Sequence, residues 1–212
     1  MDIPQWKAAP LVLVSAAGCY AFMLLFNWVQ SGFKEFGGQN NSTVFIYYPL
    51  IYLLPAKILK IDFKKLWILL AVGAPLIQAI GHIGCIFTGC CCGYPASWGI
   101  YNEVKDYRGT YLFPNQLLES LVALAITFFF MWKDRKNGYA PNAKHYPMML
   151  IMFASTRFFL EFLRNEPKLL LGLSRVSFHM LFAIVVAIVW LIILNRKEKA
   201  SVKVAPSAEE AC

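Results

Sequence analysis

The sequence predicts an all-α integral membrane protein with about six transmembrane helices and a polar site on the outer-leaflet side. Of its 212 residues, 58% are hydrophobic and 16% are aromatic, and the mean hydropathy is +0.53. This composition is more apolar than that of a soluble domain of the same length. Four apolar stretches are long enough to cross a hydrocarbon core of about 30 Å as helices, namely 11–29, 66–87, 113–132 and 176–195.

Two further stretches, 43–59 and 146–163, are shorter and more polar, as expected of helices that face a site. Pro49 and Pro55 predict that the first of them is kinked or irregular. The segments between the six stretches are too short to fold alone, so we expect one polytopic membrane domain over 1–199. The charged and small residues at 200–212 predict a disordered cytoplasmic tail.

The basic charge of the chain follows the predicted topology. The formal net charge is +8, from 20 lysines and arginines against 12 acidic residues. With the N-terminus inside, thirteen of the basic residues fall in inner segments and six in outer segments, and Arg157 lies within a span. This positive-inside bias predicts two cytoplasmic termini. Topology therefore accounts for the charge, and we expect no nucleic-acid partner.

The most unusual stretch is 81–93, which reads G-H-I-G-C-I-F-T-G-C-C-C-G at the outer end of the third span. Its glycines let the backbone approach another helix or a ligand closely; they are Gly81, Gly84, Gly89 and Gly93. Its imidazole and thiols suit metal ligands, a disulfide, or a nucleophile with its base; they are His82, Cys85, Cys90, Cys91 and Cys92. A purely structural role at a helix contact also stays open.

Two other polar groups lie at outer ends of spans in this topology. Gln116 and Glu119 are three residues apart and share one helix face, while Arg157, Glu161 and Arg164 follow i, i+4, i+7 spacing on another. Ionisable residues within a membrane are costly, so they are usually functional or mutually paired. A structural Arg157–Glu161 ion pair is one interpretation. Two arginines at headgroup level also suit bidentate binding of a phosphate, which predicts an anionic phospholipid ligand.

Three motifs resemble those of the prolipoprotein diacylglyceryl transferase family. Residues 81–93 are similar to its pattern G-R-x-G-N-F-x-N-G-E-x-x-G, and 113–119 resemble its H-P-x-Q-L-Y-E segment. Residues 157–167 resemble its R-F-x-x-E-x-x-R-x-x-P segment, and order and spacing agree over about 30–195. The resemblance implies a bacterial cytoplasmic-membrane enzyme, with an outward-facing site, that moves diacylglyceryl from phosphatidylglycerol to a lipoprotein cysteine. Six spans with an inner N-terminus are what loss of the family's first span would give.

The resemblance also implies roles for individual residues. Arg157, Glu161, Arg164, Gln116 and Glu119 match the family's positions, so the lipid-phosphate side is retained. On the acceptor side, the family's Arg, first Asn and Glu fall on His82, Cys85 and Cys90, and its second-motif His falls on Phe113. The family's His-Gly-Gly loop corresponds to Phe36, Gly37 and Gly38.

The resemblance implies that a thiolate displaces glycerol phosphate from a glycerol carbon. Arg157 and Arg164 would stabilise the phosphate, with His82 as base or phosphate partner. One of Cys85, Cys90, Cys91 and Cys92 could take the lipid covalently and pass it on. The expected acceptor is a lipoprotein precursor or a small thiol; we expect no cofactor and no resident metal, and a monomer.

Two other classes of protein stay open. One is a membrane metal-binding protein in which His82, Cys85 and the Cys90–Cys92 run supply ligands to zinc or a soft metal. The other is a thiol-disulfide protein that pairs Cys85 with one of Cys90, Cys91 and Cys92. The sequence contains no C-x-x-C pair, which counts against a redox enzyme of the usual kind.

Overall fold

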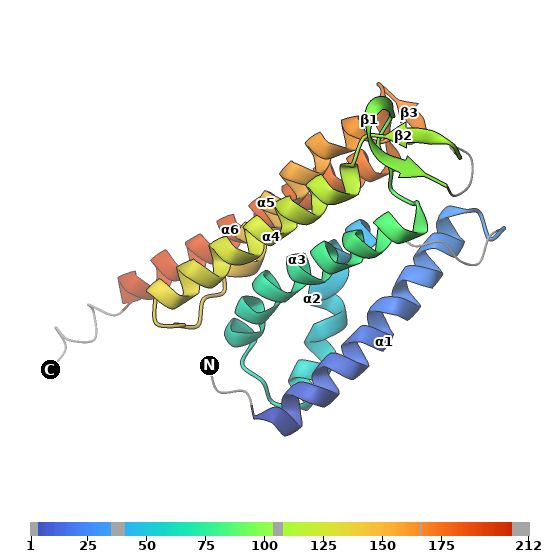
Figure 1. Ribbon diagram of the computed structural model, residues 1–212. Helices are drawn as coiled ribbons and strands as arrows, with labels where there is room; N and C mark the ends of the chain where they lie inside the picture. The colour runs from blue at the N-terminus through green and yellow to red at the C-terminus, as the bar shows by residue number, and fades with distance from the viewer. Residues whose placement is uncertain (1–3, 35–40, 104–107, 166, 205–212) are drawn as a thin grey trace, which may run out of the picture.

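The computed structural model describes residues 4–34, 41–103, 108–165 and 167–204 as an elongated helical bundle with two short β-hairpins at one end (Figure 1). Six α-helices account for most of it: α1 Gln5–Gln30, α2 Asn41–Ile58, α3 Phe63–Thr88, α4 Asn115–Lys136, α5 His145–Leu160 and α6 Arg175–Val204. Helix α3 packs chiefly on α4, and α5 packs chiefly on α6. The predicted helical architecture is therefore confirmed.

Five of the six helical segments are long and apolar enough to cross a membrane: Trp6–Val29, Phe63–Thr88, Asn115–Lys136, His145–Leu163 and Arg175–Ala200. The apolar part of α2, Phe45–Ile58, is shorter, so the structure has five long candidate spans where the sequence predicted about six. Large apolar side chains stay exposed along these helices, among them Phe87 at 81% and Leu13 at 70%. Contiguous apolar exposure on this scale suits lipid contact rather than water.

The chain is not purely helical, because two connections between helices form antiparallel hairpins. Strand β1, Pro95–Asn102, pairs with β2, Thr110–Leu112, and β3, Lys168–Leu170, pairs with β4, Leu173–Ser174. Both hairpins lie at the end of the bundle where α3 ends and α4 begins (Figure 1). The prediction of an all-α fold is wrong here, since the backbone groups of these connections are satisfied by pairing between the strands of each hairpin.

The end of α5, which carries site residues, differs from the prediction. Helix α5 ends at Leu160 and is followed by a 3₁₀ turn, η2, over Glu161–Leu163, after which Arg164 is extended. A continuous helix through Arg164 was the wrong prediction. Helix α6 runs from Arg175 to Val204, and residues 205–212 of the predicted tail lie outside the described residues.

The apolar core holds the helices together through aromatic contacts. The Phe45 ring packs edge-on against Phe153 with centroids 4.5 Å apart, and Trp67 packs against Tyr146 at 5.7 Å. The buried Tyr146 hydroxyl donates to the Phe45 carbonyl, the backbone group four residues before Pro49. A proline inside α2 removes one helical hydrogen bond, and such side-chain donors help to satisfy the backbone around it.

Candidate functional site

A buried polar network occupies the end of the bundle that carries the hairpins, with Glu119 at its centre. The carboxylate oxygen Oε2 of Glu119 lies 2.7 Å from His82 Nε2, and Asn115 Nδ2 donates to Oε1 at 2.6 Å. Arg157 Nη1 and Arg164 Nη1 lie 3.4 and 3.6 Å from the same Oε1. Side chains from three helices and from an extended segment thus surround the Glu119 carboxylate.

Glu161 is the second carboxylate of the network and is fully buried. Its Oε2 lies 2.5 Å from Arg157 Nη1 and 3.8 Å from Arg164 Nε, while Ser174 Oγ donates to Oε1 at 2.6 Å. The Arg157–Glu161 ion pair is therefore present. It belongs to a larger group of two arginines and two carboxylates, in which the charges of the four side chains balance. Such mutual pairing is what allows ionisable groups to be buried here.

The glycines of the 81–93 stretch shape the turn that follows α3. Gly89 ends the helix in the left-handed conformation, with φ of 64°. Gly93 forms an antiparallel bridge with Arg164, and a Cβ there would lie 2.8 Å from the Phe113 carbonyl oxygen and 3.0 Å from the Leu163 carbonyl oxygen. Gly93 is thus the position where a close backbone approach connects the cysteine loop to Arg164.

The other two glycines behave differently from the prediction. A Cβ at Gly81 or Gly84 would meet no atom within 4 Å among the residues that the structure describes. Both therefore face open space on α3, and the interpretation that they bring two helices together is wrong. Contact with a ligand at these two positions stays a prediction.

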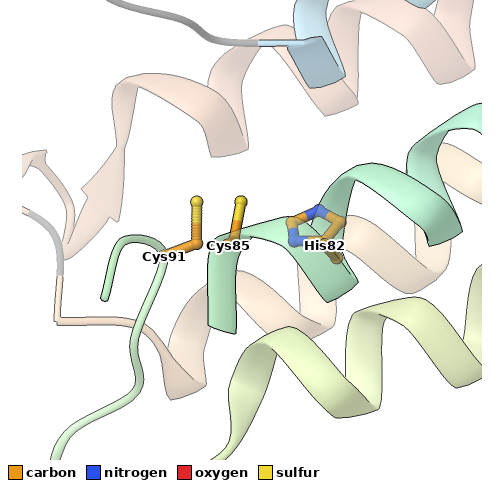
Figure 2. Close-up of side chains that lie close together, drawn as sticks. All are labelled: His82, Cys85 and Cys91. Atoms are coloured by element: carbon orange, nitrogen blue, oxygen red, sulfur yellow. The ribbon is translucent and has the colours of Figure 1, made fainter. Parts of the chain in front are cut away.

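The four cysteines of the stretch fall into two groups. The thiols of Cys85 and Cys91 lie with the His82 imidazole, such that the three possible ligand atoms are all within 4.8 Å of one another (Figure 2). Cys92 Sγ instead donates to the Gly89 carbonyl at 3.2 Å and accepts from Gln116 Nε2 at 3.3 Å. Cys90 is exposed, and its Sγ lies 3.1 Å from Thr88 Oγ1.

Two of the three thiols in the loop after α3, those of Cys91 and Cys92, also differ in acidity. The Cys85 thiol bonds to Cys91 and lowers the pKa of Cys91 to about 5, with Arg164 and His82 adding to the effect against the opposing cost of burial. Cys91 has φ of 59°, a conformation that costs a non-glycine residue about 1–3 kcal/mol. Burial raises the pKa of Cys92. Cys91 is therefore the loop thiol set up to be a thiolate.

An open pocket of about 210 Å³ lies next to the network, between the end of α3, strand β1 and the start of α4. Cys92 and Gln116 line it together with the aromatic rings of Phe87 and Tyr101. Gln116 Nε2 also donates to the Cys90 carbonyl at 2.8 Å, so this side chain connects the pocket to the cysteine loop.

The structure thus brings together most of the site residues that the sequence singled out. His82, Gln116, Glu119, Arg157, Glu161, Arg164 and the Cys85–Cys92 thiols gather at one end of the bundle, whereas Gly37 and Gly38 lie outside the described residues. Sequence reasoning missed Gln78, Asn115 and Ser174. The first two stand four residues before His82 and Glu119 on the same helix face, a spacing that signals such a partner.

Comparison with known proteins gives one consistent answer. A family model described as prolipoprotein diacylglyceryl transferase matches residues 11–195. The phosphatidylglycerol–prolipoprotein diacylglyceryl transferase 2 of Clostridium perfringens is 35% identical over 113 residues, 51% of this chain and 43% of that protein. The corresponding transferase of Clostridium tetani is 30% identical over 132 residues, 60% of this chain and 52% of its own length. A Dehalococcoides mccartyi transferase is 29% identical over 136 residues, 62% and 52% of the two chains.

The chain spans about half the length of the curated relatives it matches. No solved structure matches the chain.

Proposed function

The chain belongs to the prolipoprotein diacylglyceryl transferase family, and we propose that it transfers a diacylglyceryl group from an anionic, phosphatidylglycerol-like lipid to a thiol. The acceptor is the cysteine of a lipoprotein precursor or a small thiol. The observation that carries this proposal is the buried network in which Arg157 and Arg164 meet Glu119 and Glu161 at one end of a bundle of membrane-length helices. The membership of this family supports a bacterial cytoplasmic membrane, and the charge distribution supports an orientation with this end facing outwards.

The two arginines differ in how firmly the carboxylates hold them. Arg157 Nη1 lies 2.5 Å from Glu161, whereas Arg164 lies 3.6 Å from Glu119 and 3.8 Å from Glu161. Charge-assisted bonds are strongest near 2.8 Å, so neither Glu119 nor Glu161 holds Arg164 as closely as Glu161 holds Arg157. We assign Arg164 as the main phosphate contact and Arg157 as the cation that Glu161 keeps in place.

The reaction is a displacement at the glycerol carbon next to the phosphate. The acceptor thiolate forms a C–S bond with that carbon, the C–O bond breaks, and glycerol phosphate leaves with the electron pair. Negative charge therefore grows on the phosphate, where Arg164 and Arg157 stabilise it more in the transition state than in the bound lipid. Glu119 and Glu161 hold the guanidinium groups in position before the lipid arrives.

The pocket beside Gln116 suits the polar part of the lipid. Its volume of about 210 Å³ fits a glycerol headgroup rather than acyl chains, which would lie along the exposed apolar faces of the helices. Gln116 supplies an amide for a headgroup hydroxyl, and the acceptor side consists of His82 and the adjacent thiols. Gly81 and Gly84, which face open space, leave room on α3 for the lipid or the acceptor.

The test is transfer by the purified full chain. We would incubate it with phosphatidylglycerol vesicles and a synthetic lipoprotein-type peptide that contains one cysteine, and follow the peptide by mass spectrometry. We expect a diacylglyceryl mass gain on the cysteine.

Arg164→Lys, which cannot bind bidentately, should lower kcat/KM by about 10²-fold. The matched control Arg135→Lys, on an exposed position at the opposite end of α4, should transfer as the wild type does. An unmodified peptide with folded wild-type protein would contradict the proposal.

A further inference from the structure

We propose that His82, Cys85 and Cys91 bind one thiophilic divalent cation, of which Zn²⁺ is the type, and leave a fourth position open for the acceptor thiol. Binding of the ion stands on the geometry of these residues alone. Its role in activating the acceptor rests on the proposed transferase function.

The three side chains come together through local structure. His82 and Cys85 are three residues apart on the last turns of α3, so they share a face, and the Gly89 turn returns Cys91 to the same place. Figure 2 shows the Cys85 and Cys91 sulfur atoms directed to the same side, away from α4. Two ligands of a tetrahedral zinc ion are separated by roughly 3.7 Å. Ligand atoms within 4.8 Å of one another therefore need to close by only about 1 Å.

The imidazole of His82 is oriented as a metal ligand requires. Its Nε2 lies 2.7 Å from Glu119 Oε2 and 2.5 Å from Gln78 Nε2, while Nδ1 is buried with no bonding partner among the described residues. The side chain is only 4% exposed, so leaving Nδ1 without a partner is costly unless a ligand takes it. A carboxylate on the far nitrogen is the usual second partner of a metal-bound histidine.

The remaining thiols of the stretch are not members of this group of three ligands, although Cys90 Sγ lies 4.0 Å from the Cys85 carbonyl oxygen. Cys92 bonds to Gly89 and Gln116, and Cys90 is exposed beside Thr88. The described cluster therefore supplies two thiols and one imidazole. This ligand set matches catalytic zinc sites, which keep an open position, better than structural sites, which are closed by four protein ligands.

An open fourth position has a chemical use here, because Cys91 lies close enough to Arg164 for the two to interact electrostatically. When the acceptor thiol R–SH binds the ion, its proton leaves to solvent and the sulfur becomes a bound thiolate. That sulfur then forms the C–S bond while the C–O bond of the lipid breaks and glycerol phosphate leaves. The ion neither gains nor loses an electron. Arg164 stabilises the leaving phosphate. The ion therefore serves the nucleophile, and Arg164 serves the leaving group.

The test measures metal directly on the reduced, purified full chain. After equilibration with Zn²⁺ and dialysis, we expect about one ion per chain in the wild type and in the controls Cys90→Ser and Cys92→Ser. Cys85→Ser and Cys91→Ser should bind at least ~100-fold more weakly, and Glu119→Gln about 10–100-fold more weakly. Co²⁺ should give a thiolate charge-transfer band that the same two cysteine variants lose.

A measurement on the wild type alone covers the case in which a variant fails to fold. Zn²⁺ should protect Cys85 and Cys91, and not Cys90, from alkylation in peptide maps. Equal Zn²⁺ content in Cys85→Ser, Cys91→Ser and wild type would overturn the proposal. Full transfer by reduced protein shown to be metal-free, or a diacylglyceryl adduct on Cys91, would overturn the ion's role in activating the acceptor. Stoichiometric metal without any transfer would support the site and contradict the transferase function instead.

Discussion

The bundle buries a histidine–carboxylate pair at each of its ends, and the two pairs differ in their surroundings. His82 Nε2 lies 2.7 Å from Glu119 at the hairpin end, and His145 Nε2 lies 2.6 Å from Asp134 at the other. Both pairs are almost inaccessible to solvent. The Asp134–His145 pair joins α4 to the start of α5 beside the Phe130 ring. The His82–Glu119 pair adjoins two arginines, a second carboxylate and two thiols.

This difference shows why a buried ion pair is by itself weak evidence of function. A single pair across two helices is sufficient to fix their register, as Asp134 and His145 do for α4 and α5. At the hairpin end, the helices could be fixed by far fewer charged groups than are present. The excess of ionisable side chains, each costly to bury, indicates chemistry there.

The largest effect is expected from breaking the charge balance of the hairpin end. Glu161→Gln keeps the shape of the side chain but leaves the buried Arg157 without its 2.5 Å partner. Removing one member of a buried pair costs about 3–5 kcal/mol of unfolding free energy. Thermal unfolding in detergent measures this, with Glu198→Gln as control, because Glu198 pairs with Lys144 on the surface and is worth about 1 kcal/mol or less. Equal losses in both variants would contradict the network.

A smaller effect is expected from the turn that joins the cysteine loop to Arg164. In Gly93→Ala the new Cβ would meet backbone oxygens of Phe113 and Leu163 at 2.8 and 3.0 Å, and neither can move without shifting its strand or turn. We expect a loss of about 1–3 kcal/mol. Gly73→Ala, within α3 with open space around it, should be neutral or stabilising. Gly93→Ala that unfolds like Gly73→Ala would show that the close approach is not required.

The last effect concerns reactivity rather than stability. With its pKa lowered to about 5, Cys91 should be a thiolate at and above roughly pH 6. Cys92, whose pKa is raised by burial, should remain a thiol at neutral pH. Metal-free protein treated with iodoacetamide across pH 5–9 should therefore be alkylated at Cys91 from the acidic end and at Cys92 only at the alkaline end. Peptide mapping gives both rates, and parallel pH profiles would contradict the assignment.

Much of this arrangement could be predicted from sequence, and the limits have physical causes. The length of the apolar stretches predicts the helices, and the positions of polar residues along them place Gln116, Glu119, Arg157 and Glu161 at one end of the bundle. Spacing cannot choose among the cysteines that follow α3. Which thiol meets His82 depends on the left-handed turn at Gly89 and on the contact of Gly93 with Phe113 and Leu163, and these are set by other segments.

The same reason accounts for the hairpins and for the end of α5. Arg164 was predicted on a helix face and reaches the network from an extended segment, because its backbone pairs with Gly93 rather than with α5. Pairing between distant segments leaves no periodic pattern in either of them.

The most direct test of the account compares transfer by two isosteric variants, one at each end. Glu119→Gln and Asp134→Asn each remove one buried carboxylate charge opposite a histidine. Normalised to folded protein, the account predicts that Glu119→Gln loses at least ~10²-fold in kcat/KM for diacylglyceryl transfer, while Asp134→Asn loses stability but transfers as the wild type does. Equal transfer by the two variants, or a loss confined to Asp134→Asn, would contradict the placement of the chemistry at the hairpin end.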